Sequence, residues 1–140
     1  MSSKAYEEYN YWLGPNEDSN WNEYITEQVA RGVLGKFSTD DWKQLNDSIL
    51  SKEEYWQERS AAALGEQRST YAIEILKKLL DSSFIEVSIA AASELDWADT
   101  QIESKYFERI QAIINTLTRE DLESYPELES LLEKAKHSKF

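Results

Sequence analysis

Apolar residues recur every three or four positions along almost the whole chain, and no stretch alternates apolar and polar residues as a half-buried strand would. This spacing gives a series of amphipathic helices, each with one apolar stripe. Gly and Pro are scarce, with 4 and 2 in 140 residues, so few positions favour the turns that short strands require. The sequence therefore predicts an all-α fold.

The expected helices begin at small polar residues, whose side chains can cap a helix N-terminus. The first helix is expected from about Lys4 to Leu13, ending at Gly14 and Pro15. Later helices are expected to start at Ser38, Ser51, Ser69, Ser83 and Thr118. Asp41, three residues after Ser38, completes a pattern that resembles a capping box. A long helix carrying residues 102–117 and a closing helix complete seven or eight antiparallel helices.

The middle of the chain repeats with an offset of 31 residues. Trp56 and Val87 are 31 positions apart, and so are Leu64 and Leu95, at the two ends of similar segments. Each segment holds three consecutive alanines, at 61–63 and 90–92, which let helix backbones approach closely. Repeats of this length are typical of stacked helix pairs, each of which buries its apolar side against the next.

The order apolar-x-x-Arg-x-Ala-x-Ala-Leu-Gly, Ala-Ile-x-x-Leu-x-x-Leu-Leu and Glu-Val-x-x-Ala-Ala-Ala resembles short HEAT-like repeats over residues 55–95. Gln57 and Ser88 depart from the family, which often carries Arg there. The resemblance implies one domain over 1–140: a short α-solenoid of about three antiparallel helix pairs. Residues 1–15 would form an N-terminal capping helix, 20–117 the repeats and 118–140 a C-terminal capping helix. A plain helical bundle is the alternative, whereas the motifs of tetratricopeptide and ankyrin repeats are absent.

The charge balance limits the choice of partner. The chain has 27 Asp and Glu against 15 Lys and Arg, a formal net charge of −12. Such a field repels nucleic acid and anionic membrane surfaces and attracts basic partners, although it also serves solubility alone. The absence of cysteine excludes disulfides, and the start of the chain does not resemble a secretory signal. We therefore expect a cytoplasmic protein that binds no nucleic acid or membrane.

The residues needed for catalysis are missing or poorly placed. The sole histidine, His137, lies close to the C-terminus, and no glycine-rich phosphate loop occurs. The acidic pairs fall in expected first turns or on polar faces, where capping and the helix dipole explain them; they are Glu7-Glu8, Asp40-Asp41, Glu53-Glu54 and Glu120-Asp121. We expect no enzyme activity, no cofactor and no metal.

Aromatic residues beside carboxylates are the best candidates for partner binding. Trp97 lies in an expected link between Asp96 and Asp99, where no core pattern requires a tryptophan. An exposed aromatic side chain flanked by acids suits a basic protein partner. If the second helices of the pairs share a face, they form an acidic, aromatic strip. Its expected residues are Asp40, Asp41, Trp42, Tyr71, Glu74, Asp96, Trp97, Asp99 and Glu103.

In general character, and over the segment from Tyr55 to Ala92, the chain is similar to the small acidic helical immunity proteins of bacterial contact-dependent inhibition and polymorphic toxin systems. The resemblance implies a protein, monomeric when free, that neutralises a toxin by masking its basic active site. The toxin would most naturally be a C-terminal nuclease domain. A cytoplasmic adaptor or scaffold that binds a peptide or a protein subunit is the alternative.

Overall fold

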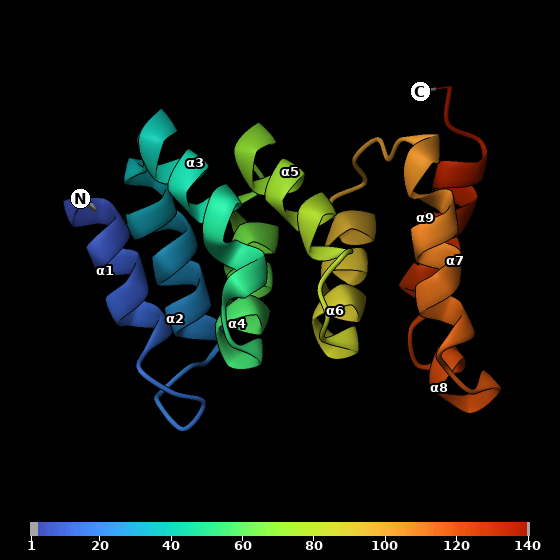
Figure 1. Cartoon of the computed structure of the whole chain (residues 1–140), viewed down its shortest axis with the longest axis horizontal. Helices are drawn as coiled ribbons and strands as arrows, with labels where there is room; N and C mark the ends of the chain where they lie inside the picture. Colours follow the sequence, from blue (N-terminus) through green and yellow to red (C-terminus); the bar gives the residue numbers. More distant parts are fainter. Residues whose placement is uncertain (1–2, 140) are drawn as a thin grey trace.

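The computed structural model describes residues 3–139, which form nine α-helices and no β-strand (Figure 1). The α-helices are α1 (Lys4–Leu13), α2 (Glu23–Gln28), α3 (Thr39–Ser48), α4 (Glu54–Gln67), α5 (Thr70–Leu79), α6 (Ile85–Trp97), α7 (Phe107–Asn115), α8 (Arg119–Glu123) and α9 (Pro126–Lys136). A π-helical turn, Val29–Val33, follows α2, and 3₁₀ turns cover Leu34–Lys36, Ile49–Ser51 and Ser104–Tyr106. The predicted all-α fold is confirmed.

The helices follow one another along the longest axis of the molecule (Figure 1). Helices α1, α2, α4 and α6 form a row in chain order, with α7 and α9 at its far end, and α3 and α5 lie along one edge. Helix α4 packs against α5 and α6, and α6 packs against α9. The described ends of the chain consequently lie at opposite ends of the row. Within residues 3–139, no helix is both long enough and apolar enough to cross a membrane.

Small residues bring α4 and α6 together, as the sequence predicts. Ala61 and Ala63 of α4 and Ala91 and Ala92 of α6 are fully buried. The large side chains of α5 fill the space beside them; Ile75, Leu76 and Leu79 are all buried. At Gly65 a β-carbon would lie 2.2 Å from the carboxylate of Glu94, so this glycine allows the Glu94 side chain to lie across α4.

Three of the predicted helix caps are confirmed. Ser38, Ser69 and Thr118 each accept a hydrogen bond from the backbone N–H three residues on, and Ser38 and Asp41 form the expected capping box. The predictions at Ser51 and Ser83 are wrong: α4 and α6 have Glu53 and Phe84 as N-cap residues, without a side-chain cap. Ser51 instead ends a 3₁₀ turn and donates to the carbonyl of Ser48.

The C-terminal third differs most from expectation. The long helix predicted over 102–117 begins only at Phe107, because residues 104–106 form a 3₁₀ turn; Ile102 is buried from the preceding link. The single closing helix is two helices, α8 and α9, separated at Tyr125. Pro126 occupies the first position of α9, where its missing N–H is not needed. Helix α9 packs against both α6 and α7.

Candidate partner-binding face

The predicted binding residues do not form one strip. Trp42 is not the exposed aromatic residue that was expected, because its side chain is 5% exposed. Its ring lies under that of Tyr71, nearly parallel to it with 5.6 Å between centroids. Tyr71 is half exposed and covers it. These residues line a groove of about 350 Å³ between α3 and α5, together with Thr39, Lys43, Asn46, Glu74 and Ile75.

Two of the predicted carboxylates have structural partners. Asp41 is buried; burial opposes its charge, but hydrogen bonds from Ser3 and Ser38 outweigh burial and lower its pKa. Asp96 accepts a hydrogen bond from Ser130 and pairs with Lys134 at 2.8 Å. Both acids therefore hold helices in place: Asp41 joins α3 to the start of α1, and Asp96 joins α6 to α9. Asp40, by contrast, is exposed.

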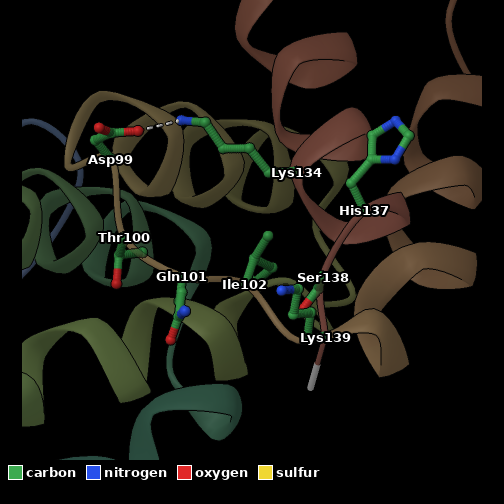
Figure 2. A pocket seen from close by; sticks show the side chains of 8 residues that line it. All are labelled: Asp99, Thr100, Gln101, Ile102, Lys134, His137, Ser138 and Lys139. Carbon is green, nitrogen blue, oxygen red and sulfur yellow. Dashed lines mark ion pairs between the residues drawn. The ribbon is translucent and has the colours of Figure 1, made fainter.

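Lysines pair with three more of the predicted acids, Glu74, Asp99 and Glu103. Lys77 is buried and binds Glu103 at 2.6 Å and Glu74 at 3.4 Å. Asp99 pairs with Lys134 at 3.0 Å. Figure 2 shows this pair in a hollow at the C-terminal end of the row, which Lys139 also lines, while the ring of His137 points away from the pair. These surfaces mix both charges and do not form the expected acidic strip.

Trp97 is exposed as expected, because 56% of its surface is accessible. It is the last residue of α6 rather than part of a link. It lines a groove of about 450 Å³, here called the Trp97 groove, with an apolar floor and carboxylates around it. The groove is lined by Glu58, Glu86, Ile89, Ala90, Ser93, Glu94, Trp97, Ser124, Tyr125 and Glu127. Helices α4, α6 and α9 and the link before α9 supply these residues.

A second groove of about 440 Å³, here called the Arg59 groove, adjoins the first and shares Glu58 with it. It is lined by Glu17, Trp21, Glu54, Tyr55, Glu58 and Arg59. The Arg59 side chain is buried, and its guanidinium lies 5.8 Å from the Trp21 ring centroid and 5.1 Å from that of Tyr55. It donates hydrogen bonds to the carbonyls of Leu13, Glu17 and Ser19 at 2.7 to 2.9 Å.

Gly14 shapes the loop that holds this guanidinium. Its φ of +84° ends α1, and its carbonyl accepts a hydrogen bond from the Tyr55 hydroxyl at 3.0 Å. A β-carbon at this position would lie 2.0 Å from the Ser19 hydroxyl oxygen. Glycine is therefore required both for the backbone conformation and for the close approach of Ser19. Ser19 in turn accepts two hydrogen bonds from the Arg59 guanidinium, one at its hydroxyl oxygen and one at its carbonyl oxygen.

We call the two grooves together the acidic face; its carboxylates are Glu17, Glu54, Glu58, Glu86, Glu94 and Glu127. Within residues 3–139 none of these carboxylates has a hydrogen-bond or ion-pair partner. Burial, with the nearby charges of Glu54 and Glu86, raises the pKa of Glu58. Burial also raises the pKa of Glu94 to about 7, against an opposing effect of Arg68. The face thus concentrates carboxylates whose negative charge the nearby Arg59 and Arg68 offset only in part.

The sequence contains a signal for the acidic face in the residue spacing along α6, although pairing aromatic residues with neighbouring acids does not reveal it. Glu86, Ala90, Glu94 and Trp97 are spaced three or four residues apart, and so are Glu86, Ile89, Ser93 and Trp97, so all six follow one side of α6. The opposite stripe of α6 is buried. The contribution of Tyr125 and Glu127 could not be seen in this way, because it depends on how α9 packs.

Carboxylates and aromatic rings are the groups that the acidic face presents to solvent or a partner. Within the described residues, no group of three or more His, Asp or Glu side chains is placed to hold a metal ion. Carboxylates beside exposed aromatic rings suit cationic side chains. Comparisons with protein-family models, with curated proteins and with solved structures find no match to this chain.

Proposed function

We propose that the chain is a binding protein, not an enzyme, and that its acidic face masks a basic surface of a protein partner. The observation that carries the proposal is the set of unpaired carboxylates around the two adjoining grooves. Carboxylates with no partner in the free protein repel one another; burial is the main cause of the raised pKa of Glu58, and the charges of Glu54 and Glu86 add to it. A cationic partner relieves this repulsion on binding, which accelerates association and favours the complex.

The partner that we propose is a toxin domain with a basic active site, such as a nuclease, so that the chain acts as a cytoplasmic immunity protein. The net charge of −12 supports fast electrostatic capture of such a domain. The row of helices and the 31-residue offset also support a short HEAT-like solenoid, an architecture that presents extended binding surfaces. In this architecture α2 with α3, α4 with α5 and α6 with α7 would be the helix pairs.

The adaptor function remains the second candidate because of the groove between α3 and α5. Its floor is the Trp42–Tyr71 stack, and Ile75 adds apolar surface. Its side chains include both Lys43 and Glu74, so it would suit a peptide of mixed charge. A peptide bound there would leave the acidic face unused, and the two functions therefore predict different sensitive surfaces.

The test is a capture experiment from the organism that encodes the chain, at about 150 mM NaCl, followed by mass spectrometry. The acidic-face variant changes Glu54, Glu58 and Glu86 to Gln. The matched control changes Glu7, Glu108 and Glu129 to Gln; these residues are exposed and lie on α1, α7 and α9. Both variants have the same net charge, so only the position of the lost charge differs.

We expect the wild-type chain and the control to retain one small basic protein, and the acidic-face variant to lose it. That protein should be toxic when expressed alone and harmless when co-expressed with this chain. Equal capture by both variants would contradict the proposed face. Loss of capture through Tyr71→Ala, with the acidic-face variant unaffected, would favour the adaptor function instead.

A further inference from the structure

The two grooves of the acidic face lie at positions related by the 31-residue offset. Arg59 of α4 lines the first groove, and Ala90, which is 31 positions later, lines the second from α6. Tyr55 and Glu86 correspond in the same way, as do Glu58 and Ile89. The second groove also has aromatic rings and carboxylates, although they come from other positions of the repeat, and an alanine stands at the position of the arginine.

The Arg59 groove shows what this combination of residues holds. There a guanidinium lies against two aromatic rings, with three glutamates lining the same hollow. The Arg59 side chain lines this hollow, and its donors reach the backbone carbonyls of the preceding loop at 2.7 to 2.9 Å rather than the glutamates. On the same face, the chain therefore already places one guanidinium against aromatic rings, with backbone carbonyls accepting its hydrogen bonds.

The Trp97 groove also combines aromatic rings with carboxylates, but no Lys or Arg is among its lining residues. Trp97 and Tyr125 provide aromatic surface, and Ile89 and Ala90 provide a floor against which an aliphatic stem can pack. Glu94 lies half-buried at this groove, and its carboxylate has no hydrogen-bond partner within residues 3–139. Burial penalises that charge, which a guanidinium from outside would compensate.

We propose that the Trp97 groove receives an arginine side chain of the protein partner, held between Trp97 and the carboxylates of Glu94 and Glu58. The inference rests on the proposed function, since it assumes that the acidic face is the side that binds. Arginine suits the groove better than lysine because its planar guanidinium both stacks on rings and pairs with a carboxylate through two hydrogen bonds. The volume of about 450 Å³ is ample for one such side chain.

The chain offers a direct test, because Ala90→Arg would supply the missing side chain from within. The probe is the peptide acetyl-Gly-Arg-Gly-Arg-Gly-amide, titrated into ¹⁵N-labelled protein at about 20 mM NaCl and pH 8. The indole N–H signals of Trp97 and Trp21 report the two grooves separately. The same peptide with lysine in place of arginine tests for the guanidinium.

We expect a saturable shift of the Trp97 signal. The affinity obtained from it should be at least threefold higher for the arginine peptide than for the lysine peptide. Ala90→Arg and Glu94→Gln should each lower the affinity for the arginine peptide fivefold or more. Ala112→Arg is the matched control, because Ala112 is an exposed alanine of α7, and it should reduce the affinity less than twofold. Circular dichroism should confirm that all variants fold.

The outcomes separate the two proposals. Binding that shifts Trp21 but leaves Trp97 unchanged would overturn the arginine groove while leaving the acidic face as the binding surface. Equal affinity for the two peptides, or an undiminished Trp97 shift in Ala90→Arg, would also overturn it. Loss of the toxin-like partner in the acidic-face variant, together with full capture by Ala90→Arg, would contradict this inference and retain the proposed function.

Discussion

Arg59 and Glu94 show two ways of placing a charge beneath a surface. Arg59 is buried, but backbone carbonyls accept its hydrogen bonds and two rings flank its guanidinium. Glu94 lies across Gly65 with no hydrogen-bond donor among residues 3–139. The first arrangement stabilises the fold. The second penalises the ionised carboxylate, because a desolvated charge without a partner is unfavourable.

Glu94→Gln should therefore change how stability depends on pH. Burial raises the pKa of Glu94 from 4.5 to about 7 in the folded protein, so the folded state binds the proton more tightly than the unfolded state. The resulting stabilisation is full below pH 4.5 and is lost as the pH rises through 7. We expect the wild type to lose about 2 kcal/mol relative to Glu94→Gln between about pH 4.5 and pH 8.

Urea unfolding of both proteins at several pH values measures this difference in stability. NMR titration of the Glu94 carboxyl measures its pKa and so gives the pH at which the difference should appear. Glu108→Gln removes a carboxylate that is exposed on α7, and it should change the free energy of unfolding by less than about 0.5 kcal/mol at any pH. A constant difference between wild type and Glu94→Gln across the pH range would show that Glu94 is fully hydrated.

At the scale of helices, local capping patterns predicted three helix starts correctly and failed at Ser51 and Ser83. Ser38, Ser69 and Thr118 cap helices through bonds to residues three positions on, and such patterns are visible in the sequence. The break at Tyr125 was visible too, since Pro126 disfavours a helical residue before it, but a single closing helix was predicted there. The 3₁₀ turn at residues 104–106 was not visible, since the apolar spacing continues through it.

The residues that depart from the HEAT-like pattern illustrate the same limit. Gln57 donates to the carbonyls of Leu50 and Lys52, while Ser88, 31 positions later, donates to those of Leu80 and Ser82. Each therefore holds the link that precedes its own helix. The repeat predicted that Gln57 and Ser88 occupy equivalent positions. It did not predict their shared role, because that role depends on the path of each link.

The candidate site was only partly predictable for a similar reason. The exposure of Trp97 followed from its acidic neighbours, whereas Trp42 has the same local sequence features and is buried beneath Tyr71. Whether an aromatic residue is covered depends on the next helix in the row. Likewise, Asp96 was an expected surface acid, but α9 brings Lys134 and Ser130 against it.

Gly65→Ala tests the contact between α4 and α6. The new β-carbon would lie on the Glu94 side chain, which is flexible and can swing into the Trp97 groove. Alanine also favours the helix by about 1 kcal/mol, which offsets this rearrangement. We expect a net stability change below about 1 kcal/mol and a lower Glu94 pKa, because the displaced carboxylate is better hydrated.

NMR titration of Glu94 in Gly65→Ala, beside urea unfolding, measures both quantities. The control is Gly35→Ala, since a β-carbon at Gly35 meets no atom within 4 Å; it should leave the Glu94 titration unchanged. A loss of more than about 2 kcal/mol in Gly65→Ala, with an unchanged Glu94 pKa, would mean that the backbones rather than the side chain resist the change.

For the whole molecule, the carboxylates of the acidic face favour binding of a basic partner but lower the stability of the free protein. A net charge of −12 opposes compaction, and the face concentrates part of it where no cation of the chain pairs with the carboxylates. Elsewhere, lysines such as Lys77 and Lys134 neutralise the acids around them. A surface selected for stability alone would distribute its lysines more evenly, and this contrast is what a partner of opposite charge would explain.

The stability of the free protein should therefore rise with salt. Ions screen repulsion between exposed carboxylates, so we expect the Tm to increase by several degrees between about 10 and 300 mM NaCl. Glu58→Lys places a cation between Glu54 and Glu86, whose charges raise the Glu58 pKa, and should remove about half of this increase. Glu108→Lys makes the same change of charge on α7 and should remove much less. Equal effects of the two variants would show that net charge alone, and not its concentration on the acidic face, destabilises the free protein.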